Sequence, residues 1–118
     1  MPKPVLIVDD NPNMSALLAE MLEVFDYQCQ TAANGPEALR KIAEQEFSLV
    51  ITDFRMPSMT GIELLNRIKA DHPKLPVALI TGYNVEELDE KDLHDKADGF
   101  LSKPFMISEI ETLLTNLT

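Results

Sequence analysis

Short apolar runs alternate with amphipathic segments from one end of the chain to the other. Three runs, Val5–Val8, residues 48–52 and residues 77–80, consist mostly of aliphatic and β-branched residues, which is typical of strands buried on both faces. Residues 27–32 and 99–101 give weaker strand signals. Because an amphipathic segment follows each run, the pattern predicts five strand–helix units, and hence a parallel sheet covered by helices on both faces.

Three of the predicted helices have recognisable starting signals. Asn11 suits an N-cap, and Pro12 suits the first helical position. Gly35, followed by a proline, opens a second helix, while Thr60 and Glu63 form a capping-box pattern for a third. The predicted inner faces of these helices are Met14, Leu17, Leu18, Met21, Leu22 and Phe25; Ala38, Leu39, Ile42 and Ala43; and Ile62, Leu65 and Ile68.

The last two helices are predicted from weaker signals. Asn84 and Glu87 have the spacing of capping residues for a short fourth helix, although its apolar stripe is poor. Residues 86–98 contain seven acidic residues against two lysines, so we expect few buried contacts and low local stability there. Ser108 and Glu111 are predicted to cap the last helix. Its predicted inner face is Ile107, Ile110, Leu113, Leu114 and Leu117.

The composition is that of one globular domain. With 118 residues, 45% of them hydrophobic and 25% charged, the chain can bury a single core, and residues 1–118 are predicted to form one domain. A net charge of −10 argues against nonspecific binding to nucleic acid or to an anionic membrane. The sequence shows no signal peptide or membrane-spanning run, which predicts a cytoplasmic protein. The single cysteine, Cys29, is interpreted as a small strand side chain rather than a reactive thiol.

Acidic residues directly follow two of the predicted strands. Asp9 and Asp10 come after the first strand, and Asp53 comes after the third. Side by side, these strands would place three carboxylates at one edge of the sheet, where their negative charges repel one another. A hard divalent cation bound through oxygen ligands would relieve that repulsion. Thr81 and Lys103 follow later strands, at the ends where parallel sheets bind ligands.

The combined pattern resembles the receiver domain of bacterial two-component response regulators. The resemblance covers essentially the whole chain and is carried by Asp9-Asp10, Asp53 followed by Met56-Pro57 and Gly61, Thr81-Gly82, and Lys103-Pro104-Phe105. It implies an α/β fold of the doubly wound, flavodoxin-like kind, with one five-stranded parallel sheet in the order 2-1-3-4-5 flanked by five helices. It also implies a signalling switch and not an enzyme, since such a domain catalyses at most its own phosphorylation and dephosphorylation.

By the same resemblance, Asp53 accepts a phosphoryl group from a histidine kinase with the help of Mg²⁺. Asp10, Asp53 and the backbone carbonyl of Arg55 are expected to bind the ion directly, and Asp9 is expected to act through water. A carboxylate can serve as the nucleophile, and Mg²⁺ supplies charge and orientation for phosphoryl transfer. Lys103 is expected to pair with Asp53 before transfer and with the phosphoryl oxygens afterwards.

The resemblance also assigns a switching pair and two tuning positions. The Thr81 hydroxyl is expected to donate to a phosphoryl oxygen and to move inward, which leaves space for Phe100. The surface formed by the fourth helix, the fifth strand and the fifth helix would then change. Arg55 and Tyr83 stand at the positions that tune loss of the phosphoryl group.

The expected partners are a histidine kinase or phosphotransfer protein, and a downstream output domain or effector outside this chain. Direct nucleic-acid binding and membrane association are not expected, and a phosphorylation-dependent homodimer stays open. A pseudo-receiver that binds partners without phosphorylation also stays open. Two further classes of protein fit less well. A Mg²⁺-dependent phosphohydrolase of the haloacid-dehalogenase type needs a second aspartate where Arg55 stands, and a flavodoxin-like cofactor site would not have an acidic loop at Asp9 and Asp10.

Overall fold

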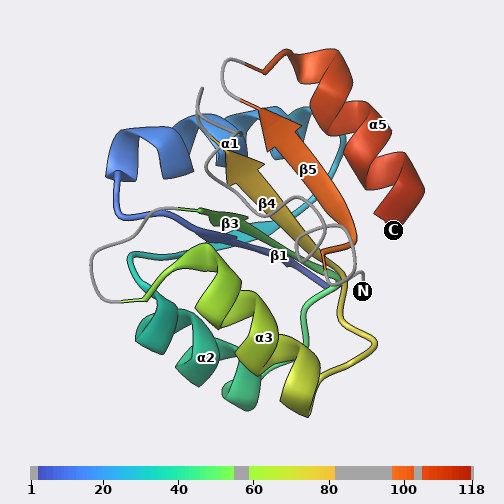
Figure 1. Ribbon diagram of the computed structural model, residues 1–118. Helices are drawn as coiled ribbons and strands as arrows, with labels where there is room; N and C mark the ends of the chain where they lie inside the picture. Colours follow the sequence, from blue (N-terminus) through green and yellow to red (C-terminus); the bar gives the residue numbers. More distant parts are fainter. Residues whose placement is uncertain (1–2, 55–58, 82–96, 103–104, 118) are drawn as a thin grey trace.

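Five parallel strands form one sheet in the order β2-β1-β3-β4-β5, as predicted. The computed structural model describes residues 3–54, 59–81, 97–102 and 105–117 (Figure 1). The strands are β1 (Val5–Val8), β2 (Cys29–Ala32), β3 (Leu49–Asp53), β4 (Val77–Thr81) and β5 (Gly99–Ser102). The predicted second strand therefore begins two residues later than expected, and the third extends to include Asp53.

Helices cover both faces of the sheet, which makes the fold doubly wound. Helices α1 (Pro12–Val24) and α5 (Ile107–Leu117) lie together on one face, and α2 (Gly35–Glu44) and α3 (Gly61–Asp71) lie on the other (Figure 1). These are four of the five predicted helices. The predicted fourth helix, with its proposed caps Asn84 and Glu87, lies outside the described residues.

The strands supply the core of both layers because their side chains alternate between the two faces. Val5 and Ile7 of β1 pack under α1 and α5, whereas Leu6 and Val8 pack under α2 and α3. All four side chains are completely buried. This explains why β1 reads as an unbroken apolar run: neither of its faces meets solvent.

Side chains of asparagine and threonine start three of the helices. The Asn11 side chain accepts hydrogen bonds from the backbone N–H groups of Asn13 and Met14, at 3.0 and 3.4 Å, so this predicted N-cap is confirmed. Thr60 caps α3 by accepting from the Glu63 N–H at 3.1 Å, also as predicted. Asn34, which was not among the predicted caps, caps α2 in the same way. Each cap satisfies backbone donors that the helix itself cannot pair.

Four predictions about the helices are wrong. Leu17 and Ile107 were expected to face inward, but they are 43% and 44% exposed. Ala43 is also exposed, at the last turn of α2. Ser108 does not cap α5, because it lies within that helix, and the Met106 N–H donates instead to Glu109. A helix sets its rotation by packing its largest apolar surface, so side chains at the border of the predicted stripe remain at the surface.

The thiol of Cys29 behaves as a half-buried strand side chain. Burial raises its pKa from 9.0 to about 11, and the nearby charge of Glu23 adds to the increase. Such a thiol is mostly protonated at neutral pH and is a poor nucleophile. The prediction that Cys29 is a strand side chain is therefore confirmed, and the raised pKa agrees with a thiol of low reactivity.

We predict that alkylation of Cys29 by iodoacetamide at pH 8 is about a hundredfold slower in the folded protein than in urea, since the pKa is higher by about two units. The raised pKa also means that this thiol stabilises the fold fully below about pH 9 and loses that contribution as the pH rises towards 11. Mass spectrometry of timed samples measures the two rates. Equal rates in both states would contradict the burial of the thiol.

An ion pair holds the beginning of β5 against β4. The Lys69 ammonium group lies 2.7 Å from a carboxylate oxygen of Asp98 and also donates to the Leu75 carbonyl oxygen at 2.8 Å. The same Asp98 oxygen accepts from the Val77 N–H at 2.9 Å. One residue of the acidic run therefore has a structural role that composition could not reveal.

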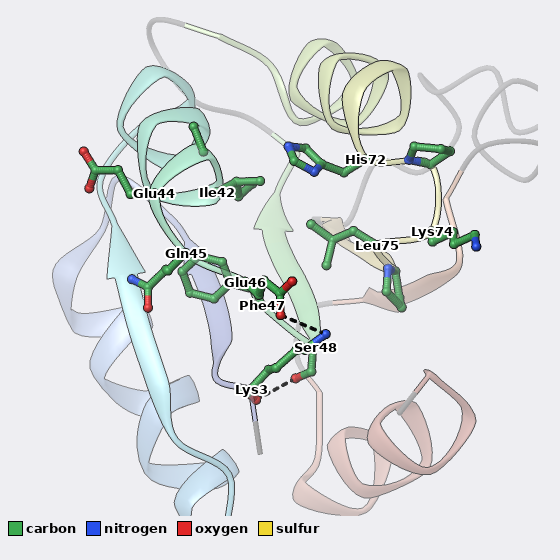
Figure 2. Close-up of a pocket in the computed structure, with 13 residues that line it drawn as sticks. Lys3, Ile42, Glu44, Gln45, Glu46, Phe47, Ser48, His72, Lys74 and Leu75 are labelled. Atoms are coloured by element: carbon green, nitrogen blue, oxygen red, sulfur yellow. Dashed lines mark hydrogen bonds and ion pairs between the residues drawn. The ribbon is translucent and has the colours of Figure 1, made fainter. Parts of the chain in front are cut away.

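The amino-terminal edge of the sheet carries a groove of about 840 Å³ between the loops that precede β3 and β4 (Figure 2). Its charged side chains include Lys3 and Glu46, which form an ion pair at 3.2 Å, and Ser48 donates to the Lys3 carbonyl oxygen at 3.0 Å. These groups interact with one another and do not converge on a common point. The aspartates lie at the opposite edge of the sheet, at the carboxyl ends of the strands.

Candidate functional site

Strand register brings the predicted acidic residues together. Strands β1 and β3 are neighbours, and Val8 of β1 pairs with Thr52 of β3. The next residues along the two strands, Asp9 and Asp53, therefore come to the same edge of the sheet. Asp10 follows directly, before α1 begins at Pro12. Parallel sheets bind ligands at this edge, outside the carboxyl ends of the strands.

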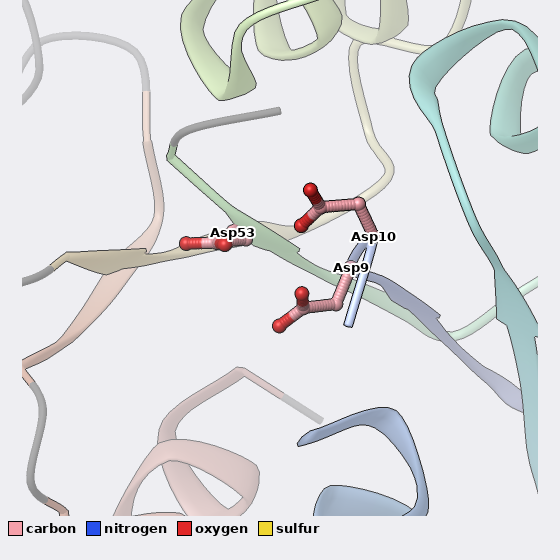
Figure 3. Close-up of side chains that lie close together, drawn as sticks. All are labelled: Asp9, Asp10 and Asp53. Carbon is pink, nitrogen blue, oxygen red and sulfur yellow. The ribbon is translucent and has the colours of Figure 1, made fainter. Parts of the chain in front are cut away.

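The three carboxylates form a cluster at this edge. Figure 3 shows that the side chains of Asp9, Asp10 and Asp53 lie close together beside the end of β3. One oxygen from each lies within 4.8 Å of the others, which is close enough for all three to contact or surround a single ion. Asp9 is buried, Asp53 is half-buried and Asp10 is exposed, so the cluster is open to solvent on one side.

The donor set fits a hard divalent cation. Three carboxylates supply only oxygen ligands, and the open side leaves room for the several water molecules that Mg²⁺ retains. The set contains no sulfur or imidazole ligand, so it does not favour the softer transition metals. Crowded negative charges also gain from a cation, because they otherwise repel one another.

Local hydrogen bonds orient Asp9 inside the cluster. One of its carboxylate oxygens accepts from the Asn11 N–H at 2.9 Å. Asn11 in turn caps α1, so the same short turn ends the strand region, positions the carboxylate and starts the helix. Asp9 is 3% exposed, and its side chain is therefore held in place by the surrounding protein.

Asp53 stands at the end of β3, where the backbone comes close to the start of α3. The Phe54 N–H donates to the Ile80 carbonyl oxygen of β4 at 2.9 Å, and the Gly61 N–H donates to the Phe54 carbonyl oxygen at 2.8 Å. A side chain at Gly61 would come within 2.6 Å of the Asp53 carbonyl oxygen. Glycine is thus needed here because the start of α3 approaches the backbone of Asp53 so closely. The sequence pattern included Gly61 but did not explain it.

The remaining predicted residues are placed only in part. Thr81 is the last residue of β4, one position after Ile80, which pairs with Asp53; the Thr81 side chain lies outside the described part of the structure. Phe100 of β5 is half-buried and packs against the core beneath α2 and α3. The predictions for Arg55, Tyr83 and Lys103 concern residues outside the described ranges.

Comparison with known proteins assigns the family. A family model described as a response regulator receiver domain matches residues 5–115, which include all five strands and the three aspartates. This chain belongs to the receiver-domain family. The resemblance inferred from the sequence pattern is therefore confirmed.

The receiver domain has relatives in two kinds of signalling protein. It is 36% identical over 111 residues to the sensor histidine kinase RcsC of Escherichia coli K12, and 34% identical over 111 residues to the transcriptional regulatory protein ZraR of Klebsiella oxytoca. These alignments cover 94% of this chain but only 12% and 25% of the two relatives. Among solved structures, a chemotaxis protein of Vibrio cholerae matches over 100% of both chains, with a TM-score of 0.90 and 28% identity.

No helix in the described part of the receiver domain is both long enough and apolar enough to cross a lipid bilayer.

Proposed function

We propose that this receiver domain is a phosphorylation-controlled switch that accepts a phosphoryl group on Asp53. The proposal rests on one observation: in a fold of this family, Asp53 shares an edge of the sheet with two further carboxylates, with oxygens of all three within 4.8 Å. A hydrophobic core does not need such a cluster, and its repulsion costs stability unless a cation offsets it. Incubation with acetyl phosphate and Mg²⁺ should add one phosphoryl group, detected by intact mass; no gain in mass would contradict the proposal.

In the proposed reaction, the phosphoryl group passes directly from a nitrogen or oxygen atom of the donor to a carboxylate oxygen of Asp53. A carboxylate oxygen of Asp53 forms the new bond to phosphorus while the bond from phosphorus to the donor, a histidine nitrogen or an acetate oxygen, breaks. Because Asp53 is half-buried, one side of its carboxylate is open. A donor can approach from this side with its leaving atom opposite the attacking Asp53 oxygen. The product is an acyl phosphate on the protein.

The residues around Asp53 are assigned separate roles in holding Mg²⁺ and in contacting the phosphoryl oxygens. Mg²⁺, when bound, supplies positive charge that offsets the charge of the carboxylates and of the transferred group. We assign Asp10, Asp53 and the Arg55 backbone carbonyl as its direct ligands. Asp9 acts through water, an assignment supported by its burial and by its hydrogen bond to the Asn11 N–H. Lys103 pairs with the phosphoryl oxygens after transfer, and Thr81 donates a hydrogen bond to one of them.

We propose that phosphorylation of Asp53 changes the protein surface through β5. Phosphorylation draws the Thr81 hydroxyl inward and leaves space for Phe100, whose backbone pairs with Leu79 of the neighbouring strand β4. Phe100 lacks a hydroxyl, so its coupling to Thr81 depends on packing alone. The exposed surface of β5 and α5, together with the predicted fourth helix, then presents a changed face to an output domain or effector. Arg55 and Tyr83 are assigned to the lifetime of the phosphoryl group.

The proposed donor is a histidine kinase or a phosphotransfer protein. Two relatives are a sensor histidine kinase and a transcriptional regulator, which is the context expected for such transfer. Helices α1 and α5 contact each other, and both begin at the edge of the sheet that carries the aspartates. Their exposed apolar side chains include Leu17 and Ile107, at 43% and 44% exposure. A donor protein that reaches Asp53 can bury this apolar surface.

We predict that Leu17→Glu slows transfer from the phosphohistidine donor about tenfold, because it places a charge in the proposed contact. Labelling by acetyl phosphate should remain unchanged, since the small donor needs no protein surface. Ala43→Glu is the matched control, because Ala43 is an exposed apolar residue on α2, on the other face of the sheet. Equal effects of both substitutions on transfer would argue against docking on the α1 side.

A further inference from the structure

Strand β2 lies at one edge of the sheet, with β1 as its neighbour. The Asp9 N–H donates to the Ala32 carbonyl oxygen at 3.1 Å, so the backbone groups of Ala32 face β1. Successive residues of a strand direct these groups to opposite sides, and those of Thr31 and Ala33 therefore face away from the sheet. An open edge of this kind is a template on which a strand of another molecule can pair.

Side chains of α2 already bond to two of these outward-facing groups. The Lys41 ammonium group donates to the Thr31 carbonyl oxygen at 2.5 Å. A Glu37 carboxylate oxygen accepts from the Ala33 N–H at 3.1 Å. Lys41 and Glu37 also form an ion pair, with 3.8 Å between nitrogen and oxygen, and their side chains are only 26% and 29% exposed. Helix α2 thus occupies two hydrogen-bonding positions that an added strand would use.

A third residue of α2 continues the row along the edge. The side-chain amides of Gln45 and Gln30 exchange two hydrogen bonds, at 3.1 and 2.7 Å. Glu37, Lys41 and Gln45 are spaced four residues apart, a spacing that places side chains along one side of a helix. Their contacts run backwards along the second strand, from Ala33 to Gln30. We call these three α2 residues the edge strap.

The sequence of β2 does not protect its own edge. Cys29–Ala32 contains neither a charged residue nor a proline, which are the residue types that commonly prevent edge strands from pairing. The charges at this edge come from Lys41 and Glu37 of the following helix. Protection of β2 therefore depends on contacts with α2 and not on the strand itself.

We propose that the edge strap prevents a second copy of this chain from adding its own β2 to the sheet. The β2 strand of a second copy fits this edge because both edges present the same groups and can pair about a two-fold axis. Such pairing would replace the bond from Lys41 to Thr31 and would bury the ammonium group away from water, which is costly. The inference goes beyond the proposed function and does not depend on it, since neither Asp53 nor a metal ion takes part.

Lys41→Ala is the first test, because it frees the Thr31 carbonyl oxygen and removes the charge from the edge. We expect the variant to form a dimer at protein concentrations about tenfold lower than the wild type requires. Sedimentation equilibrium of the unphosphorylated protein in the absence of Mg²⁺ measures this. Arg40→Ala is the matched control, since Arg40 is exposed on the same helix and its loss changes the net charge equally. Equal association of the two variants would overturn the proposal.

Thr31→Pro, introduced into the Lys41→Ala variant, locates the contact. The Thr31 N–H faces away from β1, so proline removes no hydrogen bond between β1 and β2 but blocks pairing at the open edge. We expect the double variant to associate no more strongly than the wild type. A dimer that persists in the double variant uses another surface, and this result would overturn the proposal.

Amide hydrogen exchange gives a second measurement that does not need the proline. Thr31 is exposed, and its outward-facing N–H should exchange more slowly as the concentration of Lys41→Ala rises, because the dimer protects it. In Arg40→Ala the exchange rate should not depend on concentration. If Thr31 exchange in Lys41→Ala is also independent of concentration while a dimer forms, β2 is not the interface and the edge strap does not have the inferred role.

Discussion

Replacing Asp53 by asparagine should abolish labelling by acetyl phosphate while leaving the fold intact. The substitution removes the nucleophilic oxygen and keeps the size of the side chain. It also removes one of three crowded negative charges, so the metal-free variant should be at least as stable as the wild type. Intact mass after incubation with acetyl phosphate and Mg²⁺ measures the labelling, and circular dichroism measures the fold.

The control for this substitution is Asp71→Asn. Asp71 is the last residue of α3, where it is exposed and far from the aspartate cluster along the chain. This variant should be labelled at the wild-type rate. If Asp53→Asn gains a phosphoryl group as readily as Asp71→Asn does, another residue is the acceptor. Sizing of the labelled wild type in the same experiment shows whether phosphorylation also produces a dimer.

The second large effect is expected on the response of stability to Mg²⁺. A ligand that binds only the folded state, at a concentration a hundredfold above its dissociation constant, adds about 2.7 kcal/mol to the free energy of unfolding. For a domain of this size, that corresponds to a rise in Tm of about 10 °C. The wild type should show this rise because Mg²⁺ offsets the repulsion among Asp9, Asp10 and Asp53.

Asp10→Asn should be more stable than the wild type without Mg²⁺ and less stable than the wild type with Mg²⁺. Without Mg²⁺ the variant should unfold at a higher temperature than the wild type, because one member of the cluster no longer carries charge. With Mg²⁺ it should gain less than about 1 kcal/mol, since a proposed direct ligand is missing. Thermal unfolding in Mg²⁺ and in NaCl of equal ionic strength separates binding from screening. A full Mg²⁺ response in Asp10→Asn would exclude Asp10 as a ligand.

Much of this architecture could be predicted from residue patterns. The run at Val5–Val8 is apolar at every position because both faces of β1 are covered, so its pattern already indicates a central strand. Asn11 and Thr60 are reliable cap signals because their hydrogen bonds join residues two or three positions apart. Such interactions involve only the local chain, and the sequence therefore contains everything needed to recognise them.

Helix rotation could not be predicted with the same accuracy. The stripe of apolar residues on α1 includes Leu17, but the helix turns so that Ser15, Leu18 and Leu22 are buried. The choice depends on the surfaces that the sheet and α5 offer, which the pattern of one helix does not contain. Ile107 at the start of α5 is exposed for the same reason.

Residue patterns are enough to predict the element order, the parallel sheet and the three aspartates, because apolar periodicity and strand-end residues are local properties of the chain. The folded structure sets how closely the Asp9, Asp10 and Asp53 carboxylates approach, because that distance follows from the register of β1 against β3. The folded structure also brings Met59 against Gly35 and pairs Asp98 with Lys69. These contacts join segments at least 24 residues apart, and no local pattern records such distances.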